Sequence, residues 1–168
     1  MDLDTIDLLI LDVDGVLTAG QVAMGEGGDR GRVFHVRDGC FLKLWHRGGG
    51  RSAIISGRSS GAVERRASDL GMAAVVQGAA DKLQAYQGVL AELGAADGQV
   101  CYVGDDLPDL GPMGRCALPV AVSNAAPTVR QAARYVTRLP GGEGAVAEVI
   151  ELILRKRRLW SRALLLEA

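Results

Sequence analysis

Three short, mainly apolar runs, each followed at once by a polar cluster, constrain the fold of this chain more than any other feature of its sequence. The runs are Leu8–Leu11, Ser52–Ile55 and Val100–Val103. Runs of this length are typical of strands that are buried on both faces of a sheet. Helical patterns alternate with them over residues 39–48, 59–70, 80–93, 126–133 and 144–158, and weaker strand patterns cover 117–122 and 135–137. The alternation predicts an α/β fold, a Rossmann-like three-layer sandwich with a mostly parallel sheet.

The rest of the chain predicts a small flap within one domain. Residues about 20–36 alternate weakly around a glycine-rich turn, which is typical of a β-hairpin. A length of 168 residues fits one domain, residues 1–168, with a C-terminal helix and tail over about 143–168. A formal net charge of −1 argues against a protein that grips nucleic acid through bulk positive charge. Because the sequence contains neither a membrane-length apolar run nor a signal peptide, we expect a cytoplasmic protein without membrane partners.

Several common catalytic classes lack their motifs in this sequence. The chain contains no G-x-S-x-G nucleophile elbow and no G-x-x-x-x-G-K-S/T phosphate loop. Its three cysteines, Cys40, Cys101 and Cys116, are widely spaced and form no C-x-x-C pair. This spacing argues against a zinc site or a disulfide framework.

Polar clusters follow the predicted strands at the edge where parallel α/β sheets bind ligands. The clusters are Asp12 with Asp14, the Ser56-Gly57-Arg58 turn, the acidic residues Asp105, Asp106 and Asp109, and Lys82 at a helix start. Carboxylates that meet at one edge repel each other unless a cation lies between them, and oxygen ligands favour Mg²⁺. A lysine and a Ser-Gly turn at a helix N-terminus suit a phosphate group. The edge therefore predicts a magnesium-dependent phosphoryl-transfer site.

The spacing of Asp12 and Asp14 allows one carboxylate to act as a nucleophile and the other as a general acid and base. Side chains two residues apart point to the same side of an extended segment. One carboxylate can attack phosphorus while the other carries a proton to the leaving alcohol and later takes one from water. Asp106 and Asp109 have two readings, because each can cap the following helix or contribute to the metal shell.

Four segments together resemble the motifs of the haloacid dehalogenase superfamily of phosphatases. They are D-V-D-G-V-L-T at 12–18, I-I-S-G-R at 54–58, Lys82, and V-G-D-D-L-P-D at 103–109. The gaps from Asp14 to Ser56 and from Ser56 to Lys82 are too short for a cap domain. Within the superfamily the chain resembles the small, tetrameric 3-deoxy-D-manno-octulosonate 8-phosphate (KDO 8-phosphate) phosphatases. Shared segments include F-H-V-R-D-G at 34–39, Gln77-Gly78, Tyr135-Val-Thr137 and Gly141-Gly-Glu-Gly-Ala-Val146.

The resemblance implies roles for the matching residues. Asp12 would be the nucleophile and a metal ligand, and Asp14 the general acid/base that also binds Mg²⁺ through its backbone carbonyl. Asp105 would complete the protein ligands of the metal. The phosphoryl group would be held by Ser56, Gly57 and Lys82. The sugar-acid end of the substrate would meet His35, Val36, Arg37, Asp38, Gly39, Lys43, Arg58 and Arg66.

The resemblance also implies a homotetramer in which the flap docks against other subunits, and a place in KDO supply for lipopolysaccharide. Three positions depart from the usual family residues: Ala147 and Lys43 stand where arginine is common, and Glu143 often has a basic counterpart. Alternative functions are a nonulosonate 9-phosphate phosphatase, a specialised-metabolism sugar phosphatase, a phospho-receiver domain and a catalytically retired subunit. The order of the motifs argues against the receiver, and the intact catalytic set argues against retirement.

Overall fold

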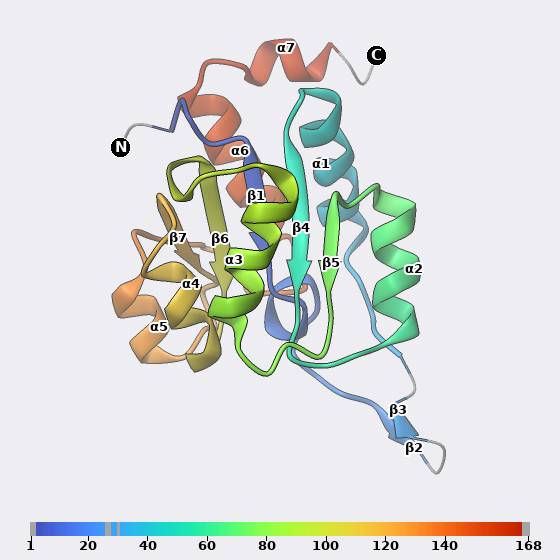
Figure 1. Cartoon of the computed structure of the whole chain (residues 1–168). Coiled ribbons are helices and arrows are strands. Elements are labelled where there is room, and N and C mark those ends of the chain that lie inside the picture. The colour runs from blue at the N-terminus through green and yellow to red at the C-terminus, as the bar shows by residue number, and fades with distance from the viewer. Residues whose placement is uncertain (1–2, 26–27, 30, 166–168) are drawn as a thin grey trace.

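A six-stranded parallel sheet forms the centre of the computed structural model, which describes residues 3–25, 28–29 and 31–165. The strand order is β5-β4-β1-β6-β7-β8, and every neighbouring pair is parallel (Figure 1). The strands are β1 (Leu8–Leu11), β4 (Arg51–Ile55), β5 (Ala74–Val76), β6 (Val100–Gly104), β7 (Leu118–Ala121) and β8 (Tyr135–Val136). All four residues of β1 are buried, as a continuous apolar run at the sheet centre requires.

Helices cover both faces of the sheet and complete three layers. They are α1 (Val36–Arg47), α2 (Gly61–Leu70), α3 (Lys82–Leu93), α4 (Leu110–Met113), α5 (Pro127–Ala132), α6 (Ala145–Lys156) and α7 (Trp160–Leu164). Figure 1 shows α3 in front of the sheet and α1 and α6 behind it, and α1 packs against α6. The predicted Rossmann-like sandwich is therefore confirmed.

Helix ends follow from local capping. Ser60 and Asp81 accept hydrogen bonds from the first backbone N–H groups of α2 and α3, and glycines in the left-handed conformation end both helices. The helix predicted over 39–48 begins three residues earlier, at Val36, because the His35 side chain accepts a hydrogen bond from the N–H of Arg37. The helix expected after Asp106 and Asp109 is the short α4, and the short α7 lies within the predicted C-terminal helix and tail, where the sequence pattern predicts no separate range for it.

The flap is smaller than the sequence pattern predicts. Antiparallel pairing joins only β2 (Met24–Gly25) and β3 (Gly28–Asp29), and residues 31–35 have no regular secondary structure. Residues 26, 27 and 30 of the predicted hairpin lie outside the described residues. Glycine has a low strand propensity, which explains why pairing stops so soon in this glycine-rich segment. The described residues between β1 and β4 form a short irregular turn at Val13–Leu17, this hairpin and α1, and those between β4 and α3 form α2 and β5, so no separate cap domain lies there among the described residues.

The C-terminal segment forms α6, which is buried along most of its length, and the short α7. Residues 166–168 of the predicted tail lie outside the described residues. Within the part of the chain that the structure describes, none of the helices has the length and apolar character needed to cross a membrane.

The sheet register brings the predicted motifs to one edge. Leu11 lies beside Ile54 of β4 and Val103 of β6. Asp12, Ser56 and Asp105 therefore follow their strands at nearly the same level, at the carboxyl edge of the sheet.

Candidate active site

The loop that follows β1 carries Asp12 and forms one irregular turn, η1 (Val13–Leu17). Asp12 is buried, with 5% of its surface exposed. Thr18 closes the loop because its hydroxyl donates to the carbonyl of Val13 and accepts from the N–H of Gly15. Gly15 has φ +98°, and a Cβ there would overlap the Asp105 carboxylate. Glycine at this position therefore allows Asp105 to lie directly against the loop.

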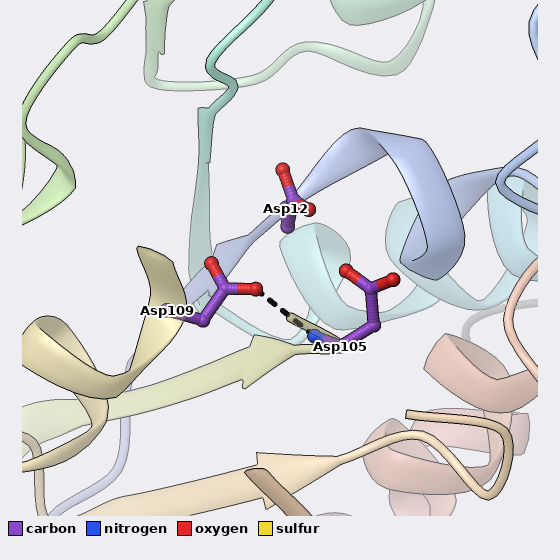
Figure 2. Close-up of side chains that lie close together, drawn as sticks. All are labelled: Asp12, Asp105 and Asp109. Carbon is purple, nitrogen blue, oxygen red and sulfur yellow. Dashed lines mark hydrogen bonds between the residues drawn. The ribbon is translucent and has the colours of Figure 1, made fainter. Parts of the chain in front are cut away.

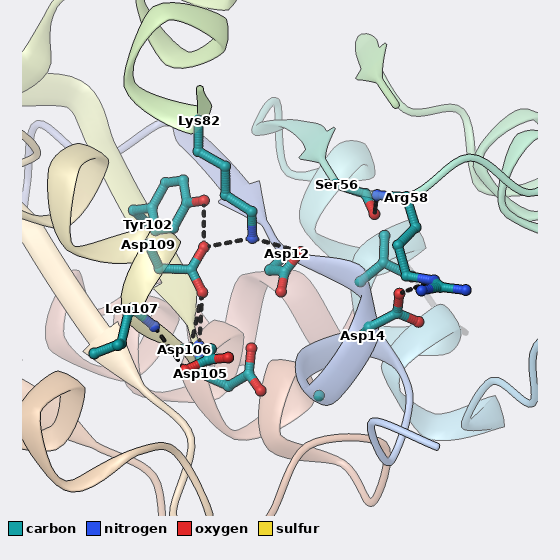
Figure 3. A network of polar contacts seen from close by, with 12 residues as sticks. Asp12, Asp14, Ser56, Arg58, Lys82, Tyr102, Asp105, Asp106, Leu107 and Asp109 are labelled. Atoms are coloured by element: carbon teal, nitrogen blue, oxygen red, sulfur yellow. Dashed lines mark hydrogen bonds and ion pairs between the residues drawn. The ribbon is translucent and has the colours of Figure 1, made fainter. Parts of the chain in front are cut away.

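Lys82, the first residue of α3, joins two carboxylates from the segments that follow β1 and β6. Its Nζ lies 2.9 Å from Asp12 Oδ1 and 2.7 Å from Asp109 Oδ1, and the lysine is buried (Figure 3). Asp109 also accepts hydrogen bonds from the Tyr102 hydroxyl at 2.8 Å and from the N–H groups of Asp105 and Asp106 at 3.0 and 3.2 Å. Asp109 is completely buried, so its charge is balanced within the protein rather than by water.

Three carboxylates meet beside this lysine (Figure 2). Asp12, Asp105 and Asp109 each place an oxygen within 4.8 Å of the others. Burial and the charge of Asp109 raise the pKa of Asp12 to about 6, although Lys82 opposes the shift. Burial and the charge of Asp12 raise the pKa of Asp105 to about 8. Burial lowers the pKa of Lys82, but Asp12 and Asp109 outweigh it and the net shift is upward.

These features fit a divalent cation. Burial, together with the neighbouring carboxylate charges, destabilises the charged forms of Asp12 and Asp105, and a cation would offset that destabilisation. Oδ1 of Asp105 is buried without a hydrogen-bond partner among the residues that the structure describes. A buried carboxylate oxygen of this kind is a suitable ligand for a hard ion such as Mg²⁺. The Asp109 oxygens, by contrast, already accept four hydrogen bonds.

Asp14 lies on the other side of Asp12, where its carboxylate meets two arginines. The Nε of Arg58 lies 3.7 Å from Asp14 Oδ2, an ion pair drawn in Figure 3, and the Nε of Arg32 lies 2.6 Å from Asp14 Oδ1. Arg58 follows Ser56, whose buried hydroxyl accepts a hydrogen bond from the Arg58 N–H. A cleft of about 310 Å³ opens at this edge, lined by Asp12, Asp14, Gly20, Ser56, Gly57, Arg58, Lys82, Asp105, Asp106 and Pro108. The structure thus brings the predicted phosphate and metal residues together.

The residues predicted for the sugar-acid end, apart from Arg58, lie elsewhere in the single chain. Among the described residues, the lining of the cleft contains none of residues 35–39, Lys43 or Arg66. Val36 and Lys43 are exposed on α1, and the Arg37 guanidinium lies over the Phe41 ring. Gly39 faces the guanidinium of Arg66, which extends over the ring of Phe34. Asp38 is buried, and its carboxylate accepts a 2.8 Å hydrogen bond from the N–H of Ala147 in α6.

The later acidic residues, Asp106 and Asp109, make different contacts in the structure, and their contact with a metal shell stays a prediction. Asp106 is exposed and accepts a hydrogen bond from the N–H of Leu107, so it caps the short turn that follows. Asp109 holds Lys82, Tyr102 and the backbone of the neighbouring loop in place. Sequence reasoning missed Tyr102 and Arg32, because neither belongs to a polar cluster after a strand.

The loop before α6, one of the segments that carry the family resemblance, also packs against the catalytic loop, a contact that the sequence did not indicate. The N–H of Gly142 donates to the carbonyl of Val16 at 2.9 Å, and the N–H of Gly141 donates to Asn124 Oδ1 at 3.0 Å. A Cβ at either glycine would overlap the backbone of residues 15–19. The backbones of the two loops are therefore in direct contact.

Comparisons with known proteins agree with this geometry. A family model described as haloacid dehalogenase-like hydrolase matches residues 49–150. The KDO 8-phosphate phosphatase of Yersinia pestis is 46% identical over 149 residues, which cover 89% of this chain and 80% of that protein. The crystal structure of the Moraxella catarrhalis KDO 8-phosphate phosphatase, in complex with magnesium, phosphate and KDO, has a TM-score of 0.94 at 37% identity and covers 99% of this chain and 95% of that one. The cobalt-bound structure of the deoxy-D-mannose-octulosonate 8-phosphate phosphatase from Haemophilus influenzae has a TM-score of 0.90 at 35% identity. That match covers 93% of this chain and 91% of the other chain.

Proposed function

Because this chain belongs to the haloacid dehalogenase-like hydrolase family, we propose that it removes phosphate from KDO 8-phosphate and releases KDO. It is a phosphoric monoester hydrolase. The observation that carries the substrate is the 46% identity to a phosphatase of this name across most of both chains. Phosphate ester hydrolysis is supported by the residues that line one cleft at the sheet edge, which include Asp12, Asp14, Lys82 and Asp105.

The proposed reaction has two steps that use the two carboxylates in turn. An oxygen of Asp12 forms a bond to phosphorus, the ester P–O bond breaks, and Asp14 gives its proton to the leaving alcohol oxygen. Asp14 then takes a proton from water while the water oxygen bonds to phosphorus and the bond to Asp12 breaks. Lys82 holds Asp12 in place and, with Ser56 and Gly57, binds the phosphoryl oxygens.

We assign the metal site to Asp12, Asp105 and the backbone carbonyl of Asp14, and the metal to Mg²⁺. This assignment is supported by the buried Asp105 oxygen, which has no hydrogen-bond partner among the described residues, and by the burial and carboxylate charge that raise the pKa of Asp105. When bound, the ion neutralises the charge of the carboxylates and of the phosphoryl group.

The sugar-acid end of the site requires more than one chain in this proposal. The predicted sugar-acid residues 35–39, Lys43 and Arg66 do not line the cleft of the single chain, whereas Arg58 does. The flap and its base expose three large apolar side chains, Met24 at 65%, Val33 at 87% and Val36 at 82%. Exposed apolar groups of this size favour association. A homotetramer in the cytoplasm, with flaps docked on neighbouring subunits, remains our prediction, and a monomer in light scattering that is active and selective would contradict it.

Phosphate release with Mg²⁺ across a panel of esters tests the function. The panel contains KDO 8-phosphate, nonulosonate 9-phosphates, hexose phosphates and an aryl phosphate. The highest kcat/KM on KDO 8-phosphate is expected, and preference for a nonulosonate ester would favour the nine-carbon alternative. Asp12→Asn should abolish turnover without unfolding the protein, since it removes the nucleophile and preserves the shape.

A further inference from the structure

The segment between the flap and α1 holds the Asp14 carboxylate through one buried arginine. Arg32 donates from Nε to Asp14 Oδ1 at 2.6 Å and from Nη2 to Oδ2 at 3.3 Å. The Arg32 side chain is 1% exposed and that of Asp14 is 20% exposed. A third bond, from Nη1 to the carbonyl of the preceding residue Gly31 at 3.2 Å, ties the guanidinium to the adjacent backbone.

This geometry restricts Asp14 far more than the other contacts of its carboxylate. A planar guanidinium that donates to both oxygens fixes the direction as well as the position of a carboxylate. Arg58 approaches the same group at 3.7 Å from an exposed position and cannot define its direction as closely. Without Arg32, the Asp14 side chain would be free to rotate towards Asp12 or into the open cleft.

We propose that Arg32 is a positioning residue that aims Asp14 at the leaving oxygen of the substrate. The inference rests on the proposed function, in which Asp14 passes its proton to that oxygen as the ester P–O bond breaks. Proton transfer requires donor and acceptor within hydrogen-bond reach, so misdirection of Asp14 slows the step. An arginine that only anchored the flap would affect all substrates alike.

Leaving-group dependence separates these two roles. An alkyl phosphate expels a basic alkoxide and needs the proton, whereas 4-nitrophenyl phosphate expels a stable phenolate and does not. In Arg32→Met we expect kcat for a primary alkyl phosphate to fall by about 100-fold, the scale of general acid catalysis, and kcat for 4-nitrophenyl phosphate to fall by less than about 10-fold. Arg32→Lys, which keeps the charge, should recover part of the alkyl activity. If Arg32→Met does not fold, the same comparison is made with Arg32→Lys, whose kcat should fall more for the alkyl phosphate than for 4-nitrophenyl phosphate.

Two controls complete the experiment. Arg51→Met removes another partly buried arginine, which pairs with Asp7 at the opposite edge of the sheet, and should leave both activities near wild type. In an Asp14→Asn background, Arg32→Met should cause no further selective loss, because it acts through Asp14. Equal losses on both esters, or an undiminished selective loss in the Asp14→Asn background, would overturn the proposal. A wild-type protein that releases phosphate neither from these esters nor from KDO 8-phosphate would instead refute the proposed function.

Discussion

Replacement of Gly142 by alanine tests whether the loop before α6 sets the position of the catalytic loop. Gly142 has φ +73°, and its Cβ would lie 2.9 Å from the Cα of Ala19 and closer still to the peptide between Thr18 and Ala19. Gly71, which ends α2, has the same φ of +73°, but a Cβ there meets nothing within 4 Å. Gly71→Ala therefore reproduces the backbone strain of Gly142→Ala without the collision.

The two variants should differ in stability and, more sharply, in turnover. The left-handed backbone costs a non-glycine residue about 1–2 kcal/mol, and this applies to both. The collision adds about 1–3 kcal/mol for Gly142→Ala, because neither backbone can move freely. Relief requires a shift of roughly 1 Å in the loop that begins at Asp12, and a displacement of that size can reduce kcat by about 100-fold.

Urea denaturation and phosphate release with Mg²⁺ measure the two effects. We expect kcat to fall at least about 10-fold in Gly142→Ala and to stay near wild type in Gly71→Ala. Wild-type kcat in Gly142→Ala, or an equal loss in both variants, would refute the idea that contact between the loops positions the nucleophile.

Three further predictions concern the charged groups. Lys82→Met should lower the free energy of unfolding by about 3–5 kcal/mol in urea denaturation and abolish phosphate release, because it leaves Asp12 and Asp109 buried without their cation. Mg²⁺ should raise the Tm of the wild type but hardly that of Asp105→Asn, and chelation should reverse the rise. Burial raises the pKa of Asp38 above its ordinary value of 3.8. The folded state therefore holds that proton more tightly, and the stability of the wild type relative to Asp38→Asn should fall as pH rises through the raised pKa, then level off. A wild-type Tm that rises relative to the Tm of Asp38→Asn as the pH rises would contradict this sign.

The site residues that could be predicted are those whose position follows from the end of a strand. Asp12, Ser56 and Asp105 each follow a buried run, and a parallel sheet brings such positions together whatever the intervening sequence. Lys82 could be predicted as a site residue because it stands at the start of a helix and matches a family motif. The sequence also indicated the layers of the fold, because apolar runs and helical patterns alternate along the whole chain.

Other contributors could not be predicted because their roles depend on contacts between distant segments. Arg32 acts on a residue 18 positions away through a segment with no regular secondary structure. Asp38 meets Ala147 across 109 positions, and its burial follows only from the packing of α1 against α6. The resemblance placed Asp38 near the substrate. In this chain its carboxylate joins two helices, and substrate contact by Asp38 remains a prediction.

The hydrogen bonds of Asp109 explain how three neighbouring carboxylates can serve different purposes. Lys82 and Tyr102 donate to one Asp109 oxygen, and two backbone N–H groups donate to the other. These donors stabilise its charge, while the same charge raises the pKa of Asp12 and Asp105. A cation can therefore stabilise the charged forms of Asp12 and Asp105, and Asp105 has a buried oxygen, without a hydrogen-bond partner in the described part of the chain, that can bind one. Asp109 therefore favours metal binding at the other two carboxylates through its charge, without having to supply a ligand.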